Sequence, residues 1–170
     1  MSNRRKVEES LNSVSRIDFA RLAAFIDGEG SIQIRKETDA RSRVTPVYEF
    51  LLTVCNSDPR LPQWCKEKFG GRVYPRSRGR HRISYLWSVK ALRAEVILGK
   101  CLPYILIKDK HAEIGLALRK TFTKRTGSRP ISVAVVEERE ILRGKLMRLS
   151  LKGKKSAEGN VIPAAAKQCG

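Results

Sequence analysis

Histidine and cysteine, the usual ligands of zinc, are scarce in this sequence of 170 residues. It has two histidines, His81 and His111, and none of its four cysteines forms a pair with the C-x-x-C spacing of zinc sites. We therefore do not expect a zinc site. We interpret the cysteines as buried free thiols of a protein that stays in a reducing compartment.

Long apolar segments are also missing. Residues 1–18 lack the apolar core of a signal peptide, and no apolar run approaches the length that spans a bilayer. We therefore expect a soluble, intracellular protein without a membrane partner.

Acidic residues are about half as common as basic ones, with 17 Asp and Glu against 35 Lys and Arg and a formal net charge of +18. Such an excess indicates a polyanionic partner, of which nucleic acid is the commonest. A membrane surface would also attract the charge, but no basic amphipathic helix supports that interpretation. A basic surface that serves only solubility remains the alternative.

The stretch Leu22–Gly30, which reads LAAFIDGEG, organises the rest of the chain. An apolar stripe at helical spacing predicts a helix here, formed by Phe19, Leu22, Ala23 and Ile26. Gly28 and Gly30 are expected to end the helix, because glycine adopts the backbone conformations that follow a C-terminus. Glu29 is then placed at a helix end that already carries partial negative charge.

Small residues recur every four positions on a neighbouring stripe, at Ala20, Ala24 and Gly28. This spacing lets the backbone of a second helix come close. Two such helices side by side would bring two carboxylates and two negative helix ends together, and such a pocket suits a divalent cation. Taken alone, Gly-Glu-Gly is more typical of a surface acid in a glycine-rich turn than of a metal site.

The nonapeptide and the strand-like Ser31–Ile34 together resemble the signature of the LAGLIDADG homing endonucleases, over roughly residues 18–155. Ala24 replaces a glycine of that signature and still permits close packing. Glu29 replaces the usual aspartate and can still ligate a metal on a longer arm. Because the chain has no second copy of the motif and no internal repeat, the resemblance is to single-motif, homodimeric members.

The order of predicted elements indicates an α+β fold. After the helix that ends near residue 29, strands are expected at 31–36, 47–55, 72–76 and about 83–89, with helices after Asp58–Pro59, around Leu92–Leu98, and near 109–124 and 132–148. This order fits one antiparallel four-stranded sheet covered by helices on one face, as the resemblance also implies. We place a single domain at 18–151, a frayed or short-helical leader at 1–17, and a disordered basic tail at 152–170.

The uncovered face of the sheet is the predicted nucleic-acid surface. Its polar residues are Gln33, Arg35, Glu49, Thr53, Arg72, Tyr74 and Arg76. Arginine and glutamine can form paired hydrogen bonds with base edges. Basic residues outside the strands suit phosphates, namely Arg78, Arg80 and Arg82 in a hairpin loop and Lys152, Lys154 and Lys155 after the last helix. An ordinary solvated sheet face is the alternative.

The resemblance implies further active-site residues. Asn56 and Arg60 match a polar and a basic residue near the scissile phosphate, where Asn56 could orient a water molecule and Arg60 could offset phosphate charge. The same segment is also a good turn and helix-capping sequence. Lys108 follows an apolar connector, as does a lysine that points into the family's active site, and Lys110 is the second candidate.

The resemblance implies a homodimer that recognises a long, roughly palindromic DNA site and cuts both strands, as in intron homing. Glu29 and the Gly28 carbonyl would hold Mg²⁺ or Mn²⁺, without any small-molecule cofactor. The interface would contain Ala20, Ala24, Asp27 and Gly28. The compartment would be a prokaryotic cytoplasm or the organelle that harbours the intron.

Nucleic-acid binders that do not cleave are the alternatives. An RNA maturase or a DNA-binding regulator could use the same fold, but neither needs the acid at Glu29 together with Lys108. A ribosomal-type RNA binder fits the charge but not a helix that ends in Gly-Glu-Gly.

Overall fold

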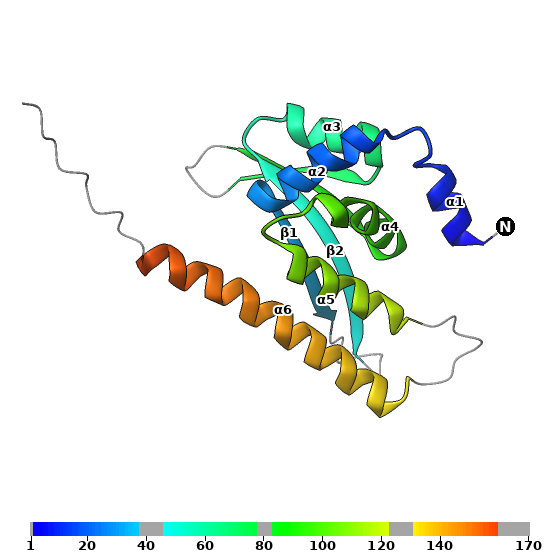
Figure 1. The fold of residues 1–170 in the computed structure, drawn as a ribbon, viewed down its shortest axis with the longest axis vertical. Coiled ribbons are helices and arrows are strands. Elements are labelled where there is room, and N and C mark those ends of the chain that lie inside the picture. The colour runs from blue at the N-terminus through cyan, green and yellow to red at the C-terminus, as the bar shows by residue number, and fades with distance from the viewer. Residues whose placement is uncertain (1, 38–45, 78–82, 123–130, 160–170) are drawn as a thin grey trace, which may run out of the picture.

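The computed structural model describes residues 2–37, 46–77, 83–122 and 131–159, with side chains described as far as Leu151 (Figure 1). The helices and strands follow one another as α1 (Asn3–Glu9), α2 (Arg16–Glu29), β1 (Gly30–Glu37), β2 (Val47–Asn56), α3 (Arg60–Phe69), β3 (Arg72–Arg76), β4 (Ser84–Lys90), α4 (Ala91–Cys101), the 3-10 helix η1 (Leu102–Tyr104), α5 (Asp109–Lys120) and α6 (Val133–Gly159). None of the described helices is both long and apolar enough to cross a bilayer.

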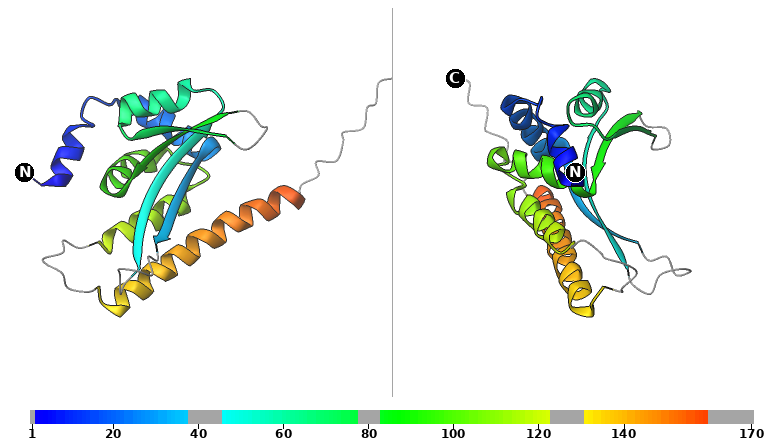
Figure 2. Two further views of the ribbon diagram at one scale, coloured as in Figure 1. Left: turned by 180° about the vertical axis from the view of Figure 1, so that it is seen from behind. Right: turned by 90° about the vertical axis from the view of Figure 1, so that its right-hand side faces the viewer.

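The four strands form one antiparallel sheet in the order β1-β2-β4-β3. Figure 2 shows the helices gathered on one side of this sheet. The predicted α+β fold is therefore confirmed. Pro75 lies in β3, which is an edge strand and so tolerates a residue without a backbone donor.

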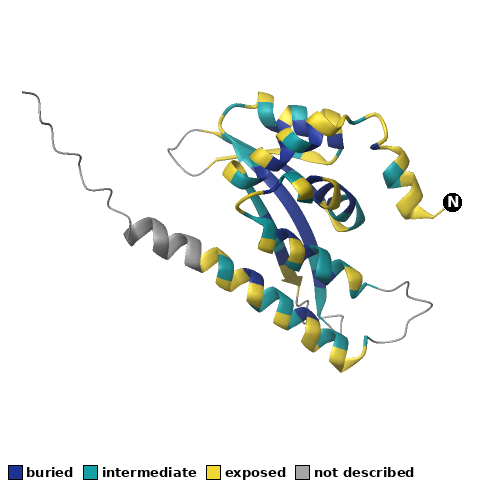
Figure 3. Ribbon diagram, viewed as in Figure 1, coloured by how far each residue is buried: buried dark blue, intermediate teal, exposed yellow. Residues whose placement is uncertain are grey.

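The core side of the sheet is formed by every second residue of its strands. Tyr48, Phe50, Leu52 and Val54 of β2 are at most 2% exposed. Figure 3 shows β2 as largely buried along its length. Leu51 and Thr53 point to the opposite face and are also only 4% exposed, because β2 is an inner strand flanked by side chains from β1 and β4.

Helix α2 begins and ends through local contacts. At its start the Ser15 hydroxyl oxygen accepts the Asp18 N–H at 3.1 Å and caps the first turn. At its end Gly30 has φ −91°, which any residue can adopt. The reason for glycine is instead steric, because a β-carbon at Gly30 would lie 2.6 Å from the α-carbon of Ile26. The predicted apolar stripe of α2 is buried, with no member more than 5% exposed.

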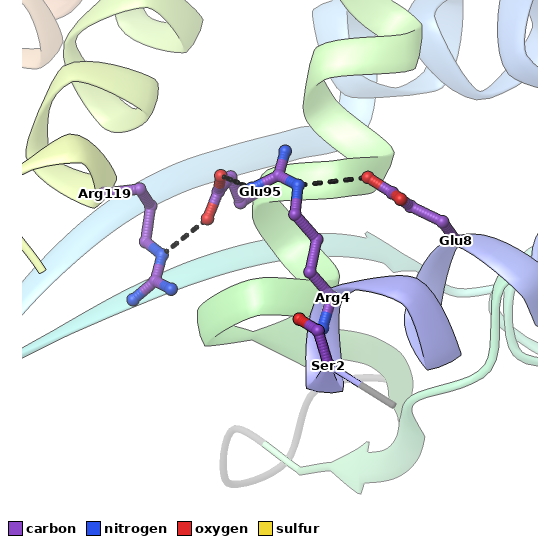
Figure 4. A network of polar contacts seen from close by, with 5 residues as sticks. All are labelled: Ser2, Arg4, Glu8, Glu95 and Arg119. Atoms are coloured by element: carbon purple, nitrogen blue, oxygen red, sulfur yellow. Dashed lines mark hydrogen bonds and ion pairs between the residues drawn. The ribbon is translucent and has the colours of Figure 1, made fainter. Parts of the chain in front are cut away.

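The N-terminal segment is attached to the domain. Glu95 on α4 accepts hydrogen bonds from Arg4 of α1 at 2.7 Å and from Arg119 of α5 at 3.1 Å (Figure 4). Leu11 is only 1% exposed and belongs to the core. The segment 1–17 thus contains a helix and also contributes to the folded body.

The last helix packs along the sheet edge at β1 and against α5. Arg139, which is 4% exposed, fixes it by donating to the hydroxyl and carbonyl oxygens of Thr121, each at 2.9 Å. Helix α6 continues to Gly159, whereas the sequence indicated an end near 148 and a disordered tail from 152. The difference has a physical reason, since lysine and alanine favour helix and a single glycine costs only about 1 kcal/mol.

Candidate catalytic centre and nucleic-acid interface

Glu29 lies at the junction between α2 and β1, where the helix passes directly into the first strand. Its side chain is exposed, and so is Gly28. A β-carbon built at Gly28 would meet no atom within 4 Å. The last carbonyls of a helix lack partners four residues further along, so this end of α2 offers carboxylate and carbonyl oxygens to a ligand.

Asp27 is two residues earlier and has a different environment. Its carboxylate accepts backbone N–H groups from Leu106 at 2.8 Å, Ile107 at 3.2 Å and Lys108 at 2.9 Å. It thereby ties the connector between η1 and α5 to the end of α2. This contact lies within the chain, and the predicted interface role of Asp27 stays a prediction.

The connector brings Lys108 to the C-terminal end of α2. Its ammonium group donates to the carbonyl oxygens of Ile26 at 2.7 Å and Gly30 at 2.8 Å, on either side of Glu29. Burial lowers the pKa of Lys108, while the carboxylates of Asp27 and Glu29 act in the opposite direction. The negative helix end attracts the ammonium group. Lys110, by contrast, is exposed on α5.

Asn56 and Arg60 lie beside the same end of the sheet, because Gly30 pairs with Val54. The Asn56 side-chain oxygen accepts the Asp58 N–H at 2.8 Å and so forms a turn. The guanidinium of Arg60 donates to Asp58 at 2.5 Å and lowers the pKa of that carboxyl group to about 2. The segment therefore forms the predicted turn, but α3 has no side-chain cap, and the phosphate roles of Asn56 and Arg60 stay predictions.

The oxygen donors at the end of α2 suit a hard divalent cation in kind, but one chain supplies few of them. Within the described ranges no three His, Cys, Asp or Glu side chains gather into a metal-binding group. Glu29 and the Gly28 carbonyl would thus need further ligands from a second chain, from water or from substrate.

The small-residue stripe of α2 faces outward over part of its length. Ala20 is half-buried, whereas Ala24 and Gly28 are exposed. Ile17, at the start of the same helix, is 66% exposed. An exposed stripe of this kind leaves room for a second helix backbone.

The open face of the sheet carries all seven predicted strand residues. Strand pairing places Arg35 opposite Glu49 and Arg72 opposite Ser88, on the side away from the core. A groove of about 710 Å³ lies over this face, and its basic lining residues are Arg35, Arg72, Arg76, Lys90 and Arg93. A groove with this charge favours a polyanion.

No family model matches the sequence, and no curated protein matches it. Several solved structures match the fold. The homing endonuclease I-CvuI, in complex with its target in the presence of calcium, has a TM-score of 0.66 and 23% identity over 79% of this chain and 82% of the other.

Two further matches agree. The archaeal intron-encoded homing endonuclease I-Vdi141I, complexed with DNA, has a TM-score of 0.66 and 13% identity over 78% of this chain and 84% of the other. The homing endonuclease I-TnaI has a TM-score of 0.56 and 11% identity over 81% and 96%. This chain has the LAGLIDADG homing-endonuclease fold.

On this fold, β4 adds outward-facing residues that we did not predict. They are Ser84, Leu86, Ser88 and Lys90, which alternate with the core residues Trp87 and Val89. That alternation was the signal that could have identified them. Arg78, Arg80 and Arg82 lie outside the described residues, and so do the side chains of Lys152, Lys154 and Lys155.

Proposed function

We propose that the protein is a site-specific DNA endonuclease that acts as a homodimer and cuts both strands with the help of a divalent metal ion. The convergence of Lys108 and Glu29 at the exposed end of α2 carries this proposal. A protein that only binds nucleic acid has no need to hold an ammonium group beside an exposed carboxylate.

The dimer follows from the count of acids. Each chain has one such helix end, whereas cutting two strands requires two centres. The exposed Ala24 and Gly28 would let the two α2 helices pack closely, and this packing would bring both Glu29 side chains to the middle of the assembly.

The metal would be Mg²⁺ or Mn²⁺, held by Glu29 and the Gly28 carbonyl of one chain together with donors from its partner and the DNA. When bound, it would lower the pKa of a water molecule and stabilise the leaving oxygen. The protein's task is to place hard oxygen ligands where the scissile phosphate arrives.

Lys108 would act on the phosphate directly. Its ammonium group is held by the Ile26 and Gly30 carbonyl oxygens, so little reorganisation is needed for it to stabilise charge on the phosphate oxygens during the reaction. Asn56 would orient water through its amide NH₂, because its oxygen is already used in the turn. Arg60 would have to break its ion pair with Asp58 before it could bind a phosphate.

The sheet would recognise the DNA sequence. A strand of about eight residues spans roughly 27 Å, which matches about eight base pairs at roughly 3.4 Å each. Two sheets would therefore read about 16 base pairs or more. The solved structures of I-CvuI and I-Vdi141I, which share this fold, are complexed with their target and with DNA, which supports DNA as the partner.

The decisive experiment incubates the protein with a library of DNA duplexes and Mg²⁺ and sequences any double-strand ends. Cuts at one defined site, absent in EDTA and absent with Glu29→Gln, are the expected result. Specific DNA binding without cuts would overturn the nuclease in favour of a regulator. Preferential binding of structured RNA, again without cuts in DNA, would favour a maturase.

A further inference from the structure

A carboxylate and an ammonium group form an ion pair within the basic groove of the open sheet. Lys90 on β4 lies 2.7 Å from Glu49 on β2. The Lys90 side chain is 67% exposed and the Glu49 side chain 23%. Both line the groove, together with Arg35, Arg72 and Arg76.

An acid on a surface that meets DNA is unfavourable unless the DNA itself offers it a hydrogen-bond donor. The phosphates repel it, and a lysine alone would bind phosphate better without it. In the major groove the only donors on base edges are the amino groups of cytosine and adenine. Glu49 can therefore contribute to binding only where its oxygens face such an amino group.

Lys90 supplies the complementary half of the pair. Beside the cytosine amino group, a C·G base pair presents two acceptors, guanine O6 and N7. An A·T pair also presents two acceptors, but adenine N7 and thymine O4 lie on opposite sides of the amino group, and the thymine methyl group is next to O4. The acceptor-and-donor pair Glu49–Lys90 therefore matches the edge of C·G best.

We propose that the Glu49–Lys90 ion pair reads one C·G base pair in each half-site, with Glu49 accepting from the cytosine amino group and Lys90 donating to guanine. This inference rests on the proposed function, because it assumes that the open sheet meets duplex DNA. Neither residue touches the reacting phosphate, so both act as specificity-determining residues.

The register of β1 and β2 also predicts where this C·G base pair lies in the half-site. Glu49 pairs with Arg35, which lies five residues beyond Gly30 along β1. Five residues of strand cover about 17 Å, or about five base pairs. The C·G preference is thus expected about five base pairs outward from the cut.

The test exchanges the two charges, as Glu49→Lys with Lys90→Glu. This double variant keeps the ion pair and the net charge but reverses acceptor and donor. Wild-type and variant proteins select duplexes from a randomised library in Ca²⁺, and the bound sequences are compared. We expect the preference at that one position to invert from C·G to G·C, while the other positions stay unchanged. Each of the two preferences should be roughly tenfold.

A matched control exchanges Arg5 and Glu9, an ion pair of 3.1 Å on α1; it should leave every position unchanged. Glu49→Gln serves as a near-isosteric second variant should the double exchange fail to fold, and it should move the preference towards A·T, because glutamine pairs with adenine.

Two results would overturn the inference. If the selected base pairs are the same for wild type, the double exchange and Glu49→Gln, the ion pair is only structural, and the endonuclease proposal still stands. If the wild-type protein selects no sequence at all, both proposals fail together.

Discussion

Glu29 and Asp27 are neighbouring acids on one helix, and the structure gives them different surroundings. Asp27 accepts three backbone N–H groups within 3.2 Å, whereas Glu29 is exposed at the end of α2. A carboxylate with three internal donors serves the fold. The exposed carboxylate of Glu29, beside the fixed ammonium group of Lys108, is available to a ligand.

Glu29→Gln should therefore abolish cleavage without unfolding the protein. The amide keeps the shape of the side chain and removes the charge that a divalent cation requires. We expect Mg²⁺-dependent cleavage to fall by several orders of magnitude, while affinity for the target, measured in EDTA, stays within about threefold. Cleavage near the wild-type rate would remove Glu29 from the catalytic centre.

Asp27→Asn is the matched control, because it makes the same chemical change two residues away. It should lower the free energy of unfolding by roughly 1–3 kcal/mol, since an amide cannot accept three N–H groups as well as a carboxylate does. It should also loosen the backbone that places Lys108. Unfolding in urea for both variants separates the two roles.

Side-chain roles were harder to predict than positions. The alternation of Ile32, Ile34 and the even-numbered residues of β2 was enough to place the sheet face correctly. The partners of Asp27 could not be predicted, because they lie about 80 positions away in sequence. Only the packed connector shows that Lys108, rather than Lys110, approaches the end of α2.

At the scale of elements, α2 contributes one face to the core and offers the other to the proposed dimer. Each residue of its apolar stripe is at most 5% exposed. Its stripe of small residues faces outward at Ala24 and Gly28. Both stripes were readable from the sequence because each repeats at helical spacing. The end of α6 could not be predicted from the sequence, because a stretch of Gly, Lys, Ser and Ala can be helical or unfolded with nearly equal ease.

Ala24→Leu should disrupt the proposed dimer. A leucine on the exposed stripe adds bulk where two helix backbones would approach, and it has room in the single chain because Ala24 is exposed. We expect a monomer in sedimentation at micromolar concentration, with an unchanged circular dichroism spectrum and no double-strand cutting. A dimeric, active variant would show that the chains associate elsewhere.

At the scale of the whole molecule, the free energy of unfolding should depend on pH in the alkaline range, because three buried side chains keep their protons in the folded protein. Burial raises the pKa of Cys65 and Cys101 to about 12. Burial and the hydrogen bond to Glu140, 2.6 Å long, raise the pKa of Tyr48 to about 12. Above their ordinary pKa values these groups lose protons in the unfolded chain but keep them in the folded one, so raising the pH favours unfolding.

Tyr48→Phe isolates one of these protons. Between pH about 10 and about 12 the wild-type free energy of unfolding should fall more steeply than that of the variant, because phenylalanine has no proton to lose. Urea unfolding of both proteins across this range measures the difference, in which the titration of the lysines cancels. Parallel curves would mean that Tyr48 ionises as readily in the folded protein as in the unfolded chain.

The net charge of +18 and the basic groove together predict a steep dependence of DNA binding on salt. Each phosphate contact releases counterions, so the logarithm of the association constant falls linearly with the logarithm of salt concentration. Arg78→Ala with Arg80→Ala should lower affinity for all sequences and flatten that slope by about one or two per subunit. Arg5→Ala with Lys6→Ala on α1 removes the same charge away from the sheet and should leave the slope nearly unchanged.

Replacing Gln33 or Arg35 should act differently, because strand residues are predicted to contact bases rather than phosphates. These variants should lose discrimination at particular base pairs and keep most of the salt slope. Titrations on matched and mismatched duplexes at several salt concentrations distinguish the two kinds of contact. If loop and strand variants lost affinity equally on both duplexes, the sheet would not read sequence, and charge alone would account for binding.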